Sequence, residues 1–206
     1  MIKLFGRLAR ITYARTCPMT FVESSLMHKL ITLLAGCACA ISTSAAGGQQ
    51  DARAEREQVP FVDVAGRQVG TATLVQTPTG VLLAVDVTGL PPGAHALHFH
   101  QTGRCDGATG FESAGGHYAL RGERHGFEVA GGAHAGDMPN QFVPASGRLV
   151  AQVFNSNVSL RSGAAALKDR DGSALIIHAG ADDYQSQPSG DAGSRLACAV
   201  IAPAGR

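Results

Sequence analysis

Three of the eight histidines in the sequence, His95, His98 and His100, fall within six residues. We interpret residues 93–101 as a strand. Because successive side chains on a strand point to opposite faces, His98 and His100 project from the same face and could bind one metal ion. His95 has the opposite parity, so we expect it to be a structural histidine or a partner of a ligand. Any one of these histidines alone could be an ordinary core or surface residue, and only the spacing of the others favours a metal.

A second group of potential ligands lies in residues 102–147, which are rich in glycine and have almost no periodic apolar pattern. His117, His125 and His134 are separated by eight and nine residues, and Asp137 follows three residues after His134. Three imidazoles and one carboxylate suit a closed, tetrahedral zinc site. A long structureless stretch inside a compact domain is usually functional. We therefore expect this loop to bind zinc.

His178 ends an apolar run, residues 174–177, and would therefore project from a rigid strand. With His98 and His100 it would form a nitrogen-rich site that suits copper, the tightest binder among the divalent first-row metals. The two groups together contain six histidines and one aspartate. Each site could be complete only if one histidine served both metals.

The elements that must position these residues are short strands separated by turn sequences, which predicts hairpins. Besides the histidine strand, six segments have strand character: residues 59–64, 68–76, 81–87, 148–160, 173–178 and 195–202. The pattern predicts an all-β chain of about eight strands with two long loops, folded as an antiparallel sandwich or barrel.

Composition and charge narrow the class of protein. A length of 206 residues is enough for one domain with a full core, and 26 glycines with no Trp favour a turn-rich β protein. Residues 1–46 carry five basic and one acidic side chain, whereas residues 47–206 carry twelve basic and fifteen acidic ones. The part that folds is therefore mildly acidic, which argues against a nucleic-acid partner, because such a partner requires a basic surface.

The start of the chain has the features of an export signal. From Met27, His28 and Lys29 precede an apolar run, residues 30–41, and a small-residue exit that ends near Ala46. We expect a signal peptide from residue 27 within a leader of residues 1–46, with a start-site extension before it. The apolar run is too short to span a bilayer, which needs ~20 residues. An alternative is a lipid on Cys37, because residues 34–37 resemble a bacterial lipobox.

Three of the five cysteines lie in this leader, which leaves Cys105 and Cys198 in the exported chain. Two cysteines in an exported domain most simply form a disulfide. Two buried free thiols are the alternative. Residues 47–58 are polar and unpatterned, which predicts a flexible tail before a domain that spans residues 59–206.

In their order and spacing, these motifs resemble the copper/zinc superoxide dismutases, in particular the exported bacterial kind. The resemblance covers residues 59–203 and rests on these fragments: His95-x-x-His98-x-His100, Gly103-x-Cys105, Gly115-Gly116-His117, His125 with His134-x-Gly136-Asp137, His178-Ala179-Gly180-Ala181-Asp182-Asp183, and Gly193-Ser194-Arg195-Leu196-Ala197-Cys198. It implies an eight-stranded antiparallel Greek-key barrel or sandwich with two long functional loops. It also implies dismutation of superoxide to O2 and hydrogen peroxide, by redox cycling of a histidine-bound copper bridged to a structural zinc.

The resemblance also implies a role for each site residue. Copper would be bound by His98, His100, His117 and His178, and zinc by His117, His125, His134 and Asp137. His117 would be the shared imidazolate ligand and, with Arg195 as the anion-docking residue beside the copper, one of two catalytic residues. Asp182 would link a copper histidine to a zinc histidine. Cys105 and Cys198 would form the family disulfide, and His95 would be structural.

The sequence departs from the family pattern at several places, which include Tyr118-Ala119-Leu120, where Phe or Tyr, then Asn or Asp, then Pro is common. Ala96-Leu97 stands where Gly-Phe is usual, which affects packing before chemistry. No lysine lies between Asp182 and Arg195, so long-range attraction of superoxide would be weaker or would come from elsewhere. The stretch between Cys105 and His117 is shorter than in many bacterial members, where it lies near the subunit contact, and this leaves a homodimer open.

Two other functions compete with the enzyme. A copper-buffering module without turnover would lack the shared histidine or the arginine, and neither His117 nor Arg195 is missing. A zinc hydrolase would need an open zinc position and a nearby general base, whereas the zinc ligands are complete. The sequence therefore favours a periplasmic enzyme, or one anchored by lipid in the periplasm if Cys37 is modified.

Overall fold

The computed structural model describes residues 54–205, so the expected leader and its cleavage site lie outside the described residues. The described part is all-β. Its strands are β1 (Arg56–Asp63), β2 (Gln68–Thr77), β3 (Gly80–Val87), β4 (Gly93–His95), β5 (Leu97–His100), β6 (Gln141–Val143), β7 (Leu149–Asn155), β8 (Ser173–His178) and β9 (Arg195–Ala202). Two 3₁₀ turns, η1 (Gly107–Thr109) and η2 (Glu112–Ala114), follow β5. Among residues 54–205, no helix has the length and apolarity needed to cross a membrane.

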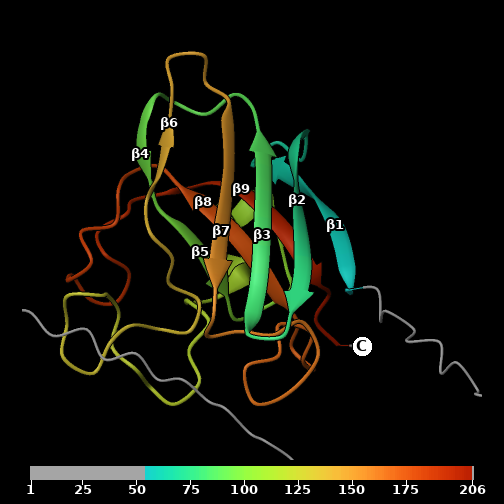
Figure 1. Ribbon diagram of the computed structural model, residues 1–206. Helices are drawn as coiled ribbons and strands as arrows, with labels where there is room; N and C mark the ends of the chain where they lie inside the picture. The colour runs from blue at the N-terminus through green and yellow to red at the C-terminus, as the bar shows by residue number, and fades with distance from the viewer. Residues whose placement is uncertain (1–53, 206) are drawn as a thin grey trace, which may run out of the picture. The chain divides into compact units, whose positions relative to one another are not determined.

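Seven of these strands form one antiparallel sheet in the order β5-β8-β9-β1-β2-β3-β7, and β4 pairs with β6. In Figure 1 the strands β1, β2, β3 and β7 lie in front of β5, β8 and β9, so the sheet curls back on itself. β1 joins the two halves, because it pairs with β2 along its length and with β9 at Val62 and Asp63. A register shift between Phe61 and Val62 marks the bend. The prediction of an all-β antiparallel sandwich or barrel is confirmed.

The main core lies between the two halves of the curled sheet, where alternate residues of the front strands meet β5, β8 and β9. Phe61, Leu74, Leu83, Phe99 and Leu175 are fully buried there. Strand β8 differs from the front strands because all six of its residues are buried. On its outer face, Ala174 and Ile176 belong to a smaller apolar cluster with Cys198 of β9 and with Phe111 and Ala114 of the loop after β5. The strand that ends at the expected copper ligand is therefore covered on both faces.

Three details differ from the predicted elements. β1 begins at Arg56, so residues 56–58 pair with β2 and do not belong to the expected flexible tail. The strand expected over residues 148–160 ends at Asn155, whose side chain accepts a hydrogen bond from the backbone N–H of Asn157. The short strand β6 falls inside the stretch predicted to be a loop.

The histidine strand is divided into β4 and β5 at Ala96. The Ala96 N–H donates to the carbonyl of Gly180, and its carbonyl accepts from the N–H of His178. The backbone of Ala96 is thus bonded to the segment around the end of β8. This division separates His95 from the two histidines of β5.

Candidate metal centre

Strand β5 is the base of the candidate site, because His98 and His100 project from it and all four of its residues are buried. The long loop after β5 returns to this strand twice. It forms isolated antiparallel bridges between His100 and His117 and between His98 and Asp137. The bridges place two residues of the loop beside the two histidines of the strand.

The two returning segments also pair with each other. The Phe99 N–H donates to the carbonyl of Gly136 at 3.0 Å, and the Gly136 N–H donates to the carbonyl of Tyr118 at 2.8 Å. A Cβ on Gly136 would lie 2.5 Å from the backbone oxygen of Phe99. Only glycine therefore allows the three segments to approach this closely.

His178 and Arg195 are brought to the site by the neighbouring strands. His178 is the last residue of β8, and its partner in the register with β9 is Arg195. The ladder is irregular between Ile177 and His178. The pairing places the guanidinium-bearing strand directly beside the strand that ends in this histidine.

Two groups of four potential ligands result. Within each group, the nearest donor atoms lie within 4.8 Å of one another. The first group is His98, His100, His117 and His178, and the second is His117, His125, His134 and Asp137. His117 belongs to both groups, and its ring centroid is 4.0 Å from that of His98.

His95 belongs to neither group. Its two ring nitrogens lie 2.8 Å from the carbonyl oxygens of His178 and Pro91, and the residue is buried. It ties the end of β8 to the segment before β4. This contact fits the structural role expected from its parity.

The ring nitrogens that face the two groups are suited to metals. Nδ1 of His98, Nε2 of His117 and Nδ1 of His125 and His134 are buried and have no hydrogen-bond partner among the described residues. The last two approach Asp137 at 3.0 and 3.4 Å without hydrogen-bond geometry. An unpartnered buried polar atom is costly, about 1–3 kcal/mol. Four imidazoles fit copper, and three imidazoles with a carboxylate fit zinc.

The opposite ring nitrogens are held by the protein. Nε2 of His98 and Nε2 of His125 each lie 2.9 Å from one oxygen of Asp182. Nδ1 of His100 lies 2.9 Å from the carbonyl of Gly115. An ionised carboxylate and a carbonyl can only accept, so each of these nitrogens donates its hydrogen. The tautomer is thereby fixed with the other nitrogen free to bind a metal.

The carboxylate of Asp182 connects the two groups and is itself held firmly. Asn140 brackets its backbone, because the Asp182 N–H donates to Oδ1 of Asn140 and Nδ2 of Asn140 donates to the Asp182 carbonyl, both at 2.8 Å. Gly190, at φ +69°, lies so close that a Cβ would be 1.9 Å from Oδ1 of Asp182. Sequence reasoning missed Asn140, because an asparagine in a polar loop has many possible roles.

Gln187 makes a comparable pair of bonds to the backbone of His125. The His125 N–H donates to Oε1 of Gln187 at 3.0 Å, and Nε2 of Gln187 donates to the His125 carbonyl at 2.8 Å. This side chain thus fastens the loop after β8 to the backbone of a potential zinc ligand. Sequence reasoning also missed this residue, which is one of several polar residues in that loop.

Burial keeps three imidazoles of the first group in the neutral form that binds metals. It lowers the pKa of His117 to about 4, although the hydrogen bond to Asp137 opposes the shift. Burial also lowers the pKa of His178 to about 3 and that of His100 well below its usual value. These three imidazoles are therefore neutral at neutral pH.

The second group is dominated by its carboxylate. Burial, the largest influence, raises the pKa of Asp137, but the hydrogen bond from His117 and the nearby rings of His125 and His134 outweigh it and hold this pKa far below its usual range. For His125 burial lowers the pKa, yet the carboxylates of Asp137 and Asp182 together raise it to about 9. The carboxylate is therefore ionised and can serve as a ligand.

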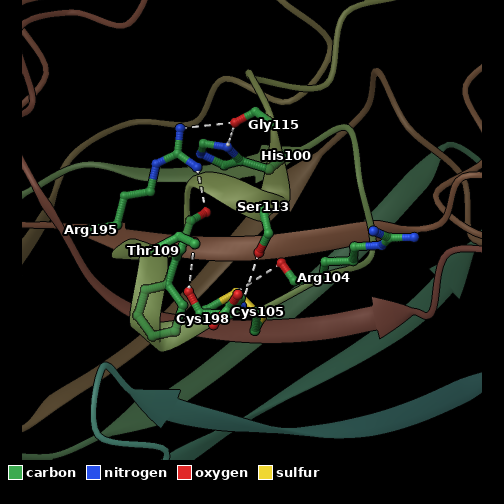
Figure 2. The surroundings of a disulfide bond; sticks show 10 residues. His100, Arg104, Cys105, Thr109, Ser113, Gly115, Arg195 and Cys198 are labelled. Carbon is green, nitrogen blue, oxygen red and sulfur yellow. Dashed lines mark hydrogen bonds between the residues drawn. A yellow bond between two sulfur atoms is a disulfide. The ribbon is translucent and has the colours of Figure 1, made fainter.

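Arg195 lies at a cavity of about 510 Å³ that is also lined by His100, His117 and His178. Its Nη1 donates to the carbonyl of Phe111 at 2.7 Å, and its Nη2 donates to that of Gly115 at 2.9 Å. Figure 2 shows the guanidinium beside Gly115 and the ring of His100. A small anion that enters the cavity would therefore meet a fixed positive charge next to the first group.

A disulfide joins Cys105 to Cys198, with the two Cα atoms 5.7 Å apart, and the predicted pairing is confirmed. It ties the loop that carries η2 to β9, three residues after Arg195, as Figure 2 shows. The alternative of two free thiols is wrong.

A curled antiparallel sheet with two four-ligand groups that share one histidine defines a class of metalloprotein with adjacent copper and zinc sites. The family model for copper/zinc superoxide dismutase (SODC) matches residues 68–201. The chain belongs to the copper/zinc superoxide dismutase family.

Curated bacterial relatives and solved structures agree with this assignment. The chain is 42% identical over 177 residues to Cu-Zn superoxide dismutase 2 of Aquifex aeolicus, which covers 85% of this chain and 99% of the relative. It is also 42% identical over 139 residues to the Cu-Zn superoxide dismutase of Caulobacter vibrioides, covering 66% and 79%. The crystal structure of a SOD-like protein from Bacillus subtilis is 35% identical, with a TM-score of 0.67 over 70% of this chain and 97% of the other.

Proposed function

We propose that this protein converts superoxide to O2 and hydrogen peroxide, with copper and zinc as its metals. The observation that carries the proposal is the position of His117, whose two ring nitrogens face different ligand groups. Membership of the copper/zinc superoxide dismutase family supports it. The second group offers four protein donors, which leaves no open position for the water that a zinc hydrolase needs.

In this proposal the first group binds copper and the second binds zinc. The copper ligands are His98, His100, His117 and His178, and the zinc ligands are His117, His125, His134 and Asp137. When bound, copper supplies one-electron redox chemistry, whereas zinc supplies positive charge and has no redox chemistry of its own. Asp182 orients His98 and His125 through its two oxygens.

The residues of the chain bind the anion and supply a proton. Arg195 attracts superoxide into the cavity and orients it, because the carbonyls of Phe111 and Gly115 fix its guanidinium. Two superoxide ions and two protons give one O2 and one hydrogen peroxide. Nε2 of His117 has no hydrogen-bond partner among the described residues. Whenever this nitrogen is not bound to copper, it can hold one of these protons and release it to the departing product.

The test is superoxide dismutation by protein purified after expression of the full chain and loaded with copper and zinc. We expect one copper and one zinc per chain and turnover that cyanide inhibits. Metal content and activity are measured on the same sample. Both metals bound without turnover would contradict the proposal and favour a copper-buffering module.

We also propose that residues 1–46 are an export leader, that the protein acts in the periplasm, and that the predicted enzyme domain of residues 59–206 is extended at its start by residues 56–58 of β1. The basic start, apolar run and small-residue exit of the leader support this. Cell fractionation and the mass of the exported protein test it, and cleavage near Ala46 is expected. A mass that carries a lipid, lost in Cys37→Ser, would favour the anchored form instead.

For the quaternary structure we propose a homodimer. The supporting observation is a set of exposed apolar side chains on β6 and β7: Phe142 at 74%, Val150 at 68% and Phe154 at 50% exposure. Apolar side chains gathered on one region often mark an interface. Sedimentation analysis of the protein and of Phe142→Ser tests this, and a monomer at all concentrations would contradict it.

A further inference from the structure

A carboxylate lies beside the guanidinium that is expected to dock the substrate. Oε2 of Glu112 is 3.5 Å from Nη2 of Arg195, and their side chains are 74% and 14% exposed. Both residues line the cavity that also contains His100, His117 and His178. The docking charge therefore faces an anionic group that belongs to the protein itself.

One short turn creates this arrangement. The turn η2 spans Glu112–Ala114, and the carbonyls that accept from Arg195 belong to the residues on either side of it, Phe111 and Gly115. The guanidinium is thus fixed at both ends of the turn, while Glu112 extends from its first position. Among the described residues, the Glu112 carboxylate has this ion pair and no hydrogen bond, so it is free to move away.

The second carboxylate that lines the cavity, that of Glu123, does not contact Arg195. The charged groups that line it, apart from the metal-group histidines, are Arg195, Glu112 and Glu123. Glu123 is fixed, because its Oε2 accepts from the N–H groups of Leu120 and Arg121 at 2.9 Å each. Of the two carboxylates, only Glu112 contacts the guanidinium.

We propose that Glu112 is a specificity-determining residue that competes with dissolved anions for Arg195. The proposal rests on the proposed function, in which the substrate is a small anion. An exposed ion pair is weak, so an incoming anion can displace the carboxylate. The competition lowers the affinity of Arg195 for every anion, and it matters most for multiply charged anions such as inorganic phosphate, which the carboxylate repels more strongly and which would otherwise occupy the cavity between turnovers.

The test compares the protein with Glu112→Gln, which keeps the shape of the side chain and removes its charge. Inorganic phosphate is titrated calorimetrically into zinc-loaded, copper-free protein, so that binding is measured without turnover. We expect the dissociation constant for phosphate to fall about twofold to fivefold in the variant, the range for loss of an exposed ion pair. In the fully loaded enzyme, kcat/KM for superoxide should rise by a smaller factor, because superoxide carries a single charge, and should fall more steeply with ionic strength.

Glu128→Gln is the matched control. Glu128 is exposed, bonds Gln185 at 2.8 Å and does not line the cavity, yet its substitution changes the net charge equally. Equal effects of the two substitutions would show that phosphate binding depends on the net charge of the protein and not on the position of Glu112, and would overturn the proposal. Unchanged phosphate binding in Glu112→Gln would also overturn it. Arg195→Gln should abolish the difference. An enzyme without turnover would contradict the proposed function alone, because the phosphate titration would still decide the role of Glu112.

Discussion

At the scale of single residues, Arg195 is the group through which the cavity meets its substrate. Its position is set by two backbone carbonyls and by the strand register with His178, so the charge is fixed before an anion arrives. It makes no contact with the ligand nitrogens other than through the carbonyl of Gly115, which His100 shares. Substrate attraction and metal binding are therefore separable at this residue.

The substitution Arg195→Glu tests that separation. It reverses the charge of the one Lys or Arg side chain among the described residues that line the cavity, so we expect kcat/KM for superoxide to fall about tenfold to a thousandfold, the range of electrostatic steering. Copper and zinc contents, measured on the same samples, should stay unchanged. Arg195→Lys should be intermediate, because lysine keeps the charge but loses the paired donors. Unchanged activity in Arg195→Glu would remove this residue from the mechanism.

The substitution Asp182→Asn acts on both metal groups at once. Each oxygen of Asp182 accepts from a ring nitrogen at 2.9 Å, whereas an amide has one acceptor and would point its NH2 at the other ring N–H. We expect the affinities for copper and for zinc each to fall about 10- to 100-fold. Competition with chelators measures the two affinities separately.

Asp183→Asn is the control for this substitution. Asp183 is the exposed neighbour, and its Oδ1 accepts from the N–H groups of Gln185 and Ser186, which an asparagine can still satisfy. Loss of affinity for only one metal in Asp182→Asn would contradict the view that this carboxylate orients both sites.

At the scale of elements, the disulfide holds the η2 loop on β9. It closes a loop of 93 positions, which in the chain-entropy model corresponds to about 4–5 kcal/mol of stability. We expect Cys105→Ser with Cys198→Ser to lower the free energy of unfolding by about that amount, measured by denaturant unfolding of the metal-free protein. Reduction of the unaltered protein should give the same decrease, and a change below about 1 kcal/mol would contradict it.

The loop after β8 is fastened to the zinc group by Gln187. Replacing it with Met keeps the length of the side chain and removes both hydrogen bonds to His125. We expect zinc to dissociate faster, by about thirtyfold for two lost bonds of about 1 kcal/mol each, and cobalt bound in its place to show an altered visible spectrum. Gln185→Met is the control, because that amide contacts only exposed Glu128. Equal zinc dissociation in the two variants would contradict the role of Gln187.

The elements also show which parts of the structure the sequence could predict. The alternation of residue types predicted a strand over residues 81–87, and β3 spans Gly80–Val87. The pattern is clear there because one face of the strand is buried and the other is half-buried. The short strand β6 was missed because three residues are too few to show an alternating pattern of apolar and polar side chains. Its partner β4 also lies 46 to 50 positions away in the sequence. The ligand residues were predicted because histidine spacing is specific. Asn140 and Gln187 were not, because their partners lie 42 and 62 positions away and nothing local marks the contact.

At the scale of the whole molecule, the two ligand groups act as a junction. Their members come from β5, from the end of β8 and from the long loop between β5 and β7. That loop has little regular structure of its own, and its segments lie on β5 through a few backbone hydrogen bonds and two isolated bridges. Binding of the metals therefore joins the long loop, whose structure the sequence patterns did not predict, to the strands β5 and β8, which they did predict.

Removal of the metals should weaken this junction. Without metals, four buried ring nitrogens have no hydrogen-bond partner among the described residues, and a ligand that binds only the folded state stabilises it by about 2.7 kcal/mol at a hundred times its dissociation constant. We expect calorimetric unfolding temperatures to rise from metal-free to zinc-loaded to fully loaded protein. Zinc should have the larger effect on proteolysis of residues 120–140, because its ligands span that segment, whereas copper draws two ligands from β5. Equal unfolding temperatures in the three forms would show that the fold alone, and not the metals, holds the long loop in place.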